Sequence, residues 1–194
     1  MNIMSMFLTD FYKFGHREQY PTDTEFVFSN WTSRKIRPEL REKGINHIAV
    51  VGLQYFLKKY LVQHFNKNFF ERPLEELLLN YKDLCKRSLN VENPYTQHII
   101  DLHNLGYLPI KIFALPEGSL VEPNVPHFVI VNTDKRFFWI PNFLETILST
   151  SLWQISTSTT IALRYREIGE YWMNEAERKN NHNKMAILPN DILT

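Results

Sequence analysis

The sequence predicts an α+β fold with a mainly antiparallel sheet and flanking helices, on two observations. Two runs dense in β-branched and aromatic residues, LPIKIFAL and HFVIVNTD, lie on either side of the turn-rich PEGSLVEPNVP, as the strands of an antiparallel pair do. Before and after this pair, apolar residues recur with the 3.6-residue period of amphipathic helices. Strands and helices are mixed rather than strictly alternating, and no repeat occurs, so a parallel βαβ arrangement is not expected.

Before this pair, the sequence predicts a short helix, a strand and a loop. The helix spans residues 10–19, with Thr9 as its N-cap, Asp10 in its first turn and Pro21 as its stop. The strand lies in TEFVFSNWTSR, which has a two-residue period and ends at Arg34. The stretch SRKIRPELREKG combines five basic with two acidic residues and is expected to be an exposed loop.

Three helices are predicted between this loop and the antiparallel pair. The first follows Val50 and the second begins at Pro73, and both carry apolar residues at the i, i+3, i+4 and i+7 positions. Asn93 and Pro94 are expected to be the N-cap and first residue of the third helix, which Gly106 closes.

Two more helices are predicted after the antiparallel pair. Pro141 opens one, and the Ser156 to Thr160 cluster is expected to cap a longer one. The longer helix carries an apolar stripe of Ile161, Tyr165, Ile168 and Trp172. If this stripe is uncovered, we expect the chain to associate or to be unstable. After Lys179 the composition changes to NNHNKMAILPNDILT, a tail with no partner visible in the sequence.

Composition argues against several classes of partner. Twenty-two Lys and Arg against 21 Asp and Glu give a net charge of +1, so we expect no nucleic-acid partner. The single Cys85 leaves no intrachain disulfide and no cysteine cluster for zinc, which is typical of a reducing compartment and predicts a cytoplasmic location. Without a long apolar stretch, no membrane partner is expected. The six glycines form neither of the motifs that cradle nucleotide phosphates.

A search for catalytic clusters finds none. HExxH, CxxC and GxSxG do not occur, and His98 and His103 lie on different faces of a predicted helix, so neither a metal site nor a catalytic residue is expected in this chain. Cys85 lies on an apolar helical face and is expected to be buried and inert.

The most informative block is TDFYKFGHREQYP. It gathers Asp10, Tyr12, Lys13, His16 and Arg17. Tyr12 and His16 share a helical face, so an acid, an aromatic ring and an imidazole could together hold a flat polar ligand. The block is also typical of a polar N-terminal helix docked through Phe11 and Phe14, and spacing alone favours that structural interpretation.

Several segments in order resemble the nicotinamide phosphoribosyltransferases. These are TDFYKFGHREQYP, the strand ending in SR, VVGLQYFLKKYL, LGYLPIKIFALPEGSLV, and VNTDKRFFWIPNFLETIL with the Ser/Thr run after it. Members of this family are much longer, so the resemblance implies an N-terminal portion leading into the first helices of a truncated α/β barrel, as in type II phosphoribosyltransferases. The implied division is an α+β domain for dimerisation and substrate contribution over residues 1–150, the start of the barrel over 151–179, and a divergent tail over 180–194.

The resemblance also implies an activity and three site residues. The family converts nicotinamide and 5-phosphoribosyl pyrophosphate to nicotinamide mononucleotide and pyrophosphate in NAD salvage. Asp10 and Tyr12 correspond to residues that meet nicotinamide across a dimer, and Arg34 to an arginine that reaches the partner's phosphates; without the family, Arg34 would be interpreted as a solvated loop residue. The family's FGxRG stretch, amide-reading aspartate, histidine and main phosphate arginines have no counterpart here, so the isolated chain is predicted to be inactive.

Partners and cofactors follow from the same resemblance. A second copy in a homodimer, or a barrel-bearing partner chain, would complete the site for nicotinamide and 5-phosphoribosyl pyrophosphate. No cofactor is expected on this chain, whereas Mg²⁺ is expected with 5-phosphoribosyl pyrophosphate in the complete enzyme. Two alternatives stay open: a stand-alone regulatory or subunit-interaction module, and a fragment of a nicotinate phosphoribosyltransferase.

Overall fold

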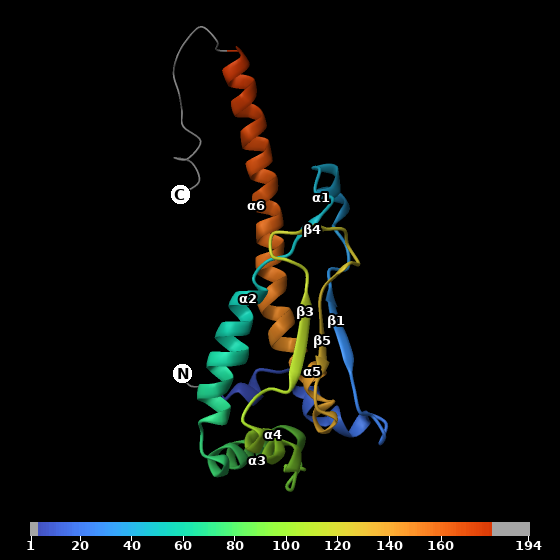
Figure 1. Ribbon diagram of the computed structural model, residues 1–194, viewed down its shortest axis with the longest axis vertical. Coiled ribbons are helices and arrows are strands. Elements are labelled where there is room, and N and C mark those ends of the chain that lie inside the picture. Colours follow the sequence, from blue (N-terminus) through green and yellow to red (C-terminus); the bar gives the residue numbers. More distant parts are fainter. Residues whose placement is uncertain (1–3, 180–194) are drawn as a thin grey trace.

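A three-stranded antiparallel sheet lies at the centre of the molecule, which the computed structural model describes over residues 4–179 (Figure 1). Its strand order is β1–β5–β3, with bounds β1 (Phe28–Thr32), β5 (Pro126–Asn132) and β3 (Ile110–Ala114). Ile112 of β3 pairs with Ile130 of β5, which confirms the antiparallel pair predicted from sequence. β1 is the strand predicted in TEFVFSNWTSR, although it begins only at Phe28.

The basic stretch after β1 is more ordered than an exposed loop. It contains a short helix, α1 (Pro38–Glu42), which starts with its proline in the first turn. Ile36 and Ile45 on either side of α1 are buried and form a small second core with Ile48. Ile48 belongs to β2 (Ile48–Ala49), which pairs antiparallel with β4 (Leu120–Val121). The loop prediction is therefore wrong in part, because isoleucines among the charges have apolar surface to bury.

The three helices predicted after Val50 are present. The first is a continuous run of α2 (Leu53–Phe56) and the wider π-helical turns η4 (Leu57–His64) and η5 (Asn66–Phe70), and it is followed by α3 (Leu74–Leu89) and α4 (Gln97–Leu105). Gly106 closes α4 with φ 80°, a left-handed conformation that glycine adopts without strain.

The expected start of α4 is wrong. Its N-cap is Thr96, whereas Asn93 and Pro94 lie outside the helix. Tyr95, which precedes Thr96, stacks on His98 with 5.5 Å between the ring centroids. The guanidinium of Arg17 lies over the Tyr95 ring at 4.5 Å from its centroid. This tertiary packing prevails over the local capping signal.

The chain then forms α5 (Ile140–Phe143), with Pro141 in its first turn, and a single long helix, α6 (Glu145–Lys179). The Ser156 to Thr160 cluster lies inside α6 and does not cap it, so that prediction is wrong. The Ser156 hydroxyl donates to the Ala49 carbonyl of β2, and the Thr160 hydroxyl accepts from the Ala49 N–H at 2.9 Å. These hydroxyls therefore tie α6 to the small sheet.

The domain division predicted after residue 150 falls within α6 and stays a prediction, and the predicted tail over 180–194 lies outside the described residues. The main core lies between the inner face of the central sheet and the surrounding helices. Phe128 and Ile130 of β5 belong to this core together with buried residues of the helices, among them Phe56, Phe69 and Leu77.

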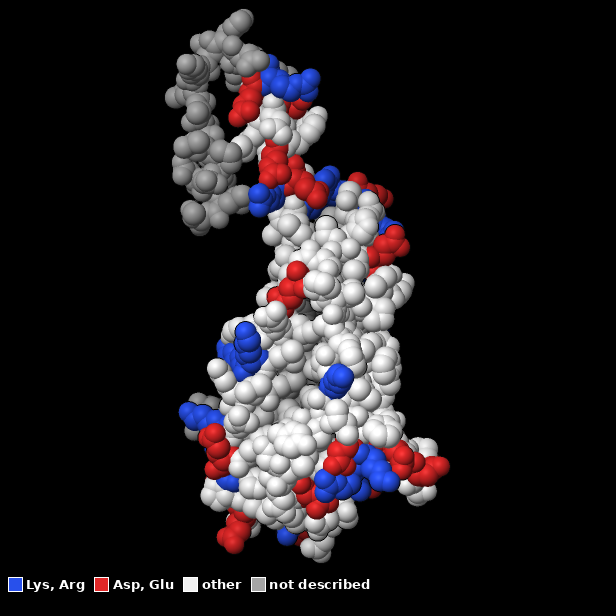
Figure 2. Space-filling view, viewed as in Figure 1, with Lys and Arg blue, Asp and Glu red and all other residues white. Residues whose placement is uncertain are grey.

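The outer half of α6 extends beyond the rest of the molecule (Figure 1). Tyr165 and Trp172 are 72% and 62% exposed there, as expected for an uncovered apolar stripe, while Ile161 near the sheet packs on the second core. Charged side chains gather mainly at the two ends of the face shown in Figure 2, and the middle of that face is largely uncharged. No helix among residues 4–179 has the length and apolar character needed to cross a membrane.

Candidate substrate-contributing site

The N-terminal block forms two short 3₁₀ turns, η2 (Phe11–Gly15) and η3 (Arg17–Gln19), rather than the single helix expected over 10–19. Thr9 is not the cap of this segment, because its hydroxyl donates to the Phe143 carbonyl at 2.8 Å. Asp10 occupies the N-cap position without a capping hydrogen bond from its side chain. The segment is thus shaped by its contacts with the junction of α5 and α6, which lies more than a hundred residues away in sequence.

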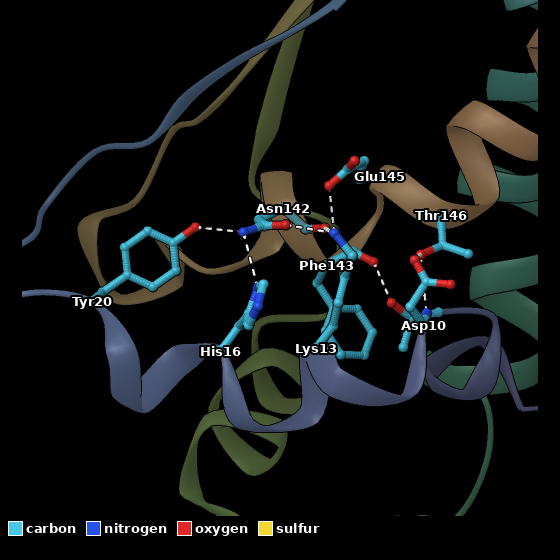
Figure 3. A network of polar contacts seen from close by, with 9 residues as sticks. Asp10, Lys13, His16, Tyr20, Asn142, Phe143, Glu145 and Thr146 are labelled. Atoms are coloured by element: carbon cyan, nitrogen blue, oxygen red, sulfur yellow. Dashed lines mark hydrogen bonds and ion pairs between the residues drawn. The ribbon is translucent and has the colours of Figure 1, made fainter.

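A buried lysine fixes the segment to that junction (Figure 3). The Lys13 side chain is only 1% exposed, and its ammonium donates to Asn142 O at 2.8 Å, to Asn142 Oδ1 at 2.6 Å and to Glu145 Oε2 at 2.5 Å. A buried ammonium needs such partners, since desolvation disfavours an unpaired charge. Lys13 therefore holds η2 against the first turn of α6.

Asn142 joins several side chains of the N-terminal segment. While its Oδ1 accepts from Lys13, its Nδ2 donates to the Tyr20 hydroxyl at 3.0 Å and lies 3.2 Å from His16 Nδ1. Because an amide nitrogen only donates, His16 Nδ1 is the acceptor in this pair. The His16 ring in turn meets the Tyr12 ring at 4.8 Å with an interplanar angle of 60°. Asn142 thus orients Tyr12 through His16.

The structure brings the predicted residues Asp10 and Tyr12 together on this segment. Asp10 Oδ2 accepts from the Thr146 hydroxyl at 2.6 Å, and the Asp10 N–H donates to the same hydroxyl oxygen at 3.0 Å. Tyr12 is 54% exposed, so one part of its ring is held by His16 while the rest is free to meet another molecule. The structural alternative is right in part, since Phe14 packs on Tyr81 and Phe143, whereas Phe11 is 46% exposed.

Arg34 lies elsewhere, after β1 and in the lining of a cavity of about 730 Å³. Lys35 and Arg37 line it as well, with Glu39 as the one acidic residue of the lining. One face of α6 also lines this cavity, with the side chains Ser149, Trp153, Ser156, Thr157, Thr160 and Ile161. Three cations beside aromatic and hydroxyl groups suit an anionic ligand such as a phosphate.

The two parts of the site are joined by α6. Thr146, which holds Asp10, and Ser149, which lines the Arg34 cavity, are three residues apart on the same helix. Three residues correspond to a rise of about 4.5 Å and most of one turn. The sequence indicated Asp10, Tyr12 and Arg34 but not Asn142, because a hydrogen bond between residues 129 positions apart leaves no local pattern. The buried role of Lys13 was missed for the same reason.

Cys85, His98 and His103 have structural surroundings. Cys85 is buried, and burial raises the pKa of its thiol, although a hydrogen bond with Tyr81 opposes this shift. His98 is buried in α4, whereas His103 Nε2 bonds to the Arg72 carbonyl at 2.9 Å. Nowhere in residues 4–179 do three His, Cys, Asp or Glu side chains gather as a metal would need.

A family model and three relatives of this chain carry the same name. The family model described as "Nicotinamide phosphoribosyltransferase, N-terminal domain" matches residues 4–112, a range that contains Asp10, Tyr12 and Arg34. A nicotinamide phosphoribosyltransferase of Acinetobacter baylyi is 42% identical over 160 residues, which are 82% of this chain and 32% of that protein. One of Xanthomonas campestris is 30% identical over 165 residues, 82% of this chain and 31% of that protein.

A more distant relative gives the same name. The nicotinamide phosphoribosyltransferase of Mycoplasma genitalium is 23% identical over 186 residues, 90% of this chain and 40% of that protein. The chain thus spans about a third of the length of the curated relatives it matches. Because the family model covers more than half of its 194 residues, this chain belongs to the nicotinamide phosphoribosyltransferase family and contains the family's N-terminal domain.

Proposed function

We propose that the chain acts as the N-terminal part of a nicotinamide phosphoribosyltransferase, which makes nicotinamide mononucleotide and pyrophosphate from nicotinamide and 5-phosphoribosyl pyrophosphate. The observation that carries the proposal is the family match over residues 4–112. The chain alone is inactive under this proposal, since the family's FGxRG stretch, amide-reading aspartate, histidine and main phosphate arginines have no counterpart in its sequence.

Tyr12 and Asp10 contribute to the nicotinamide subsite of a second chain. A ring that stacks on a pyridine needs a free face and a fixed orientation, and Tyr12 combines 54% exposure with the edge contact from His16. Asp10 is held beside it by Thr146. These contacts lie at one surface of the molecule, so the ring reaches a ligand bound by another chain, either a second copy or a barrel-bearing partner.

Arg34 contributes to the binding of the phosphates. It is exposed, and Lys35 and Arg37 line the same cavity, which gives the region a local positive charge in a chain of net charge only +1. A planar guanidinium binds phosphate oxygens in pairs, and the positive field draws in 5-phosphoribosyl pyrophosphate. Mg²⁺ prefers oxygen ligands and arrives with the pyrophosphate, because a lining with one carboxylate does not fit a cation site of its own.

A chimeric enzyme tests the proposal. Residues 1–172 replace the aligned segment of the Acinetobacter baylyi relative, and formation of nicotinamide mononucleotide is measured for the chimera, the intact relative and this chain alone. We expect product from the first two and none from the third. A chimera that folds and assembles like the intact relative, yet makes no product, would contradict the proposed function.

Substitutions in the chimera test the roles of the residues. Tyr12→Ala raises the KM for nicotinamide about tenfold, because a lost aromatic pair is worth about 0.5–1.5 kcal/mol beyond its buried area. Tyr12→Phe keeps the stacking and most of the affinity. Arg34→Ala raises the KM for 5-phosphoribosyl pyrophosphate about 10- to 100-fold, as expected for a charge-assisted hydrogen bond of about 1.5–3 kcal/mol. Arg41→Ala, at an exposed arginine of α1, serves as the matched control.

The same assay separates the alternatives. The relatives carry the name nicotinamide phosphoribosyltransferase, which favours nicotinamide over nicotinate as the base. Faster turnover of nicotinate by the chimera would instead favour a nicotinate enzyme. The regulatory alternative requires that this chain, added to an intact relative, binds it and changes its rate. A second copy as partner and a cytoplasmic location remain parts of the same proposal.

A further inference from the structure

Three buried nitrogen atoms belong to side chains that line one small cavity behind the N-terminal segment. Among residues 4–179, four buried side-chain atoms have no hydrogen-bond partner within the protein, and three of them are Arg17 Nε, His98 Nδ1 and Trp139 Nε1. All three residues line the same cavity of about 10 Å³. Buried polar atoms are almost always satisfied, so three exceptions in one place point to a common partner.

The rings around this cavity hold the three atoms in place. His98 is 9% exposed and Trp139 4% exposed, and their rings meet edge to face at 5.1 Å. Tyr95 also stacks on His98, and the guanidinium of Arg17 lies over the Tyr95 ring at 4.5 Å from its centroid. Because these side chains are packed against one another, they cannot rotate to bring their nitrogens to other hydrogen-bond partners without breaking the aromatic contacts.

The size and the donor set of the cavity define its ligand. A volume of about 10 Å³ is close to that of a single water-sized sphere and excludes an organic ligand. An indole Nε1 and a guanidinium Nε only donate hydrogen bonds, which excludes a cation. Burial, followed by the nearby Arg17 charge, lowers the pKa of His98 to about 3, so the imidazole is neutral at physiological pH and one of its nitrogens accepts.

We propose that this cavity binds one internal water molecule, which accepts from Trp139 Nε1–H and Arg17 Nε–H and donates to His98 Nδ1. Two donors and one acceptor match the two lone pairs and a hydrogen of water. A halide ion would instead need a third donor and would require the His98 proton on Nδ1. The assignment therefore also places the His98 proton on Nε2.

This water joins parts of the chain that are distant in sequence. Arg17 belongs to η3, His98 to α4, and Trp139 immediately precedes α5. The water thus fixes one end of the N-terminal segment, while Lys13 and Asn142 fix its middle. The inference is independent of the proposed function, because it rests only on the contacts of these residues within the chain.

Nuclear magnetic resonance of the ¹⁵N-labelled chain tests the proposal. We expect a cross-peak between a long-lived water and the Trp139 indole N–H, together with nitrogen shifts of His98 that report a proton on Nε2. Trp153 and Trp172, 54% and 62% exposed, are internal references that exchange with bulk water. Arg17→Met removes one donor from a partly exposed side chain and is expected to speed exchange of the Trp139 indole proton at least severalfold. Arg87→Met, on exposed α3 surface, leaves that rate unchanged.

Three results would overturn the proposal. A Trp139 indole signal without a water cross-peak would show that no water binds there. A saturable shift of that signal on bromide titration, in place of the cross-peak, would assign the cavity to an anion. A proton on His98 Nδ1 would contradict the hydrogen-bond directions. Trp139→Phe gives a second check, since it abolishes the cross-peak and must leave the remaining tryptophan signals in their native positions.

Discussion

Replacing Lys13 by methionine tests whether the buried ammonium holds the N-terminal segment in place. Methionine retains most of the volume and the apolar stem of lysine but removes the three hydrogen bonds to Asn142 and Glu145. Glu145 is 63% exposed and regains water, so its bond contributes little. The Asn142 carbonyl and Oδ1 lose bonds to a charged donor, each worth about 1.5–3 kcal/mol.

The net loss is smaller than the sum of these bonds. Removing the charge also relieves several kcal/mol of desolvation at a side chain that is 1% exposed. We therefore expect Lys13→Met to lower the free energy of unfolding by about 2 kcal/mol. For a chain of this size, that corresponds to a fall in Tm of about 4–8 °C.

Urea denaturation followed by circular dichroism measures the effect, and hydrogen exchange measures the opening of the N-terminal segment. Lys82→Met on the exposed surface of α3 is the control, with an expected change below about 0.5 kcal/mol. The reasoning is refuted if Lys13→Met unfolds at the same urea concentration as the control and exchanges at the same rate over residues 10–20.

Three further predictions concern other parts of the chain. The pKa of His98 falls from 6.5 in the unfolded chain to about 3 in the folded one, so the unfolded chain binds the extra proton between these values. The free energy of unfolding therefore decreases as the pH falls through this window, by at most about 1.4 kcal/mol per pH unit. Urea titrations at several pH values measure this dependence, and the free energy of unfolding of His98→Gln should change less steeply with pH than that of the unsubstituted chain. Burial raises the pKa of Cys85, so a disulfide reagent at pH 8 is expected to label the native thiol much more slowly than the urea-unfolded one; equal rates would contradict its burial. The isolated chain is expected to bind a hydrophobic dye through the outer half of α6, and the double substitution of Tyr165 and Trp172 by serine should reduce the fluorescence; an unchanged signal would place the dye elsewhere.

Local patterns predicted the elements whose stability is local. The density of β-branched and aromatic residues in HFVIVNTD and LPIKIFAL, on either side of a turn-rich segment, gave the right antiparallel pair, because such residues fit the partly buried surface of a sheet. The apolar spacing after Val50 and Pro73 gave the helices, and Gly106 gave a helix end, because only glycine adopts its positive φ without strain.

Errors arose where distant contacts decide the local structure. Polar side chains such as Ser156 and Thr160 signal a helix start, yet here they bond to the β2 backbone from the middle of a helix. Thr9 similarly bonds to Phe143 and not to its own segment. Within the candidate site, Asp10, Tyr12 and Arg34 are candidates named through family resemblance and stay predictions, whereas the contacts of Asn142 are visible only in the folded chain.

Because α6 is one continuous helix, the number of residues between the two parts of the site fixes the direction in which each part faces. The helix holds Asp10 at Thr146 and then passes the Arg34 cavity and β2 at Ser149 and Ser156. Inserting one residue after Thr146 would rotate everything beyond it by about 100° and shift it by about 1.5 Å. The N-terminal segment and the cavity wall would then face different directions, although each kept its own sequence. Insertions of seven residues, which come close to two full turns, would restore the direction but displace the wall by about 10 Å.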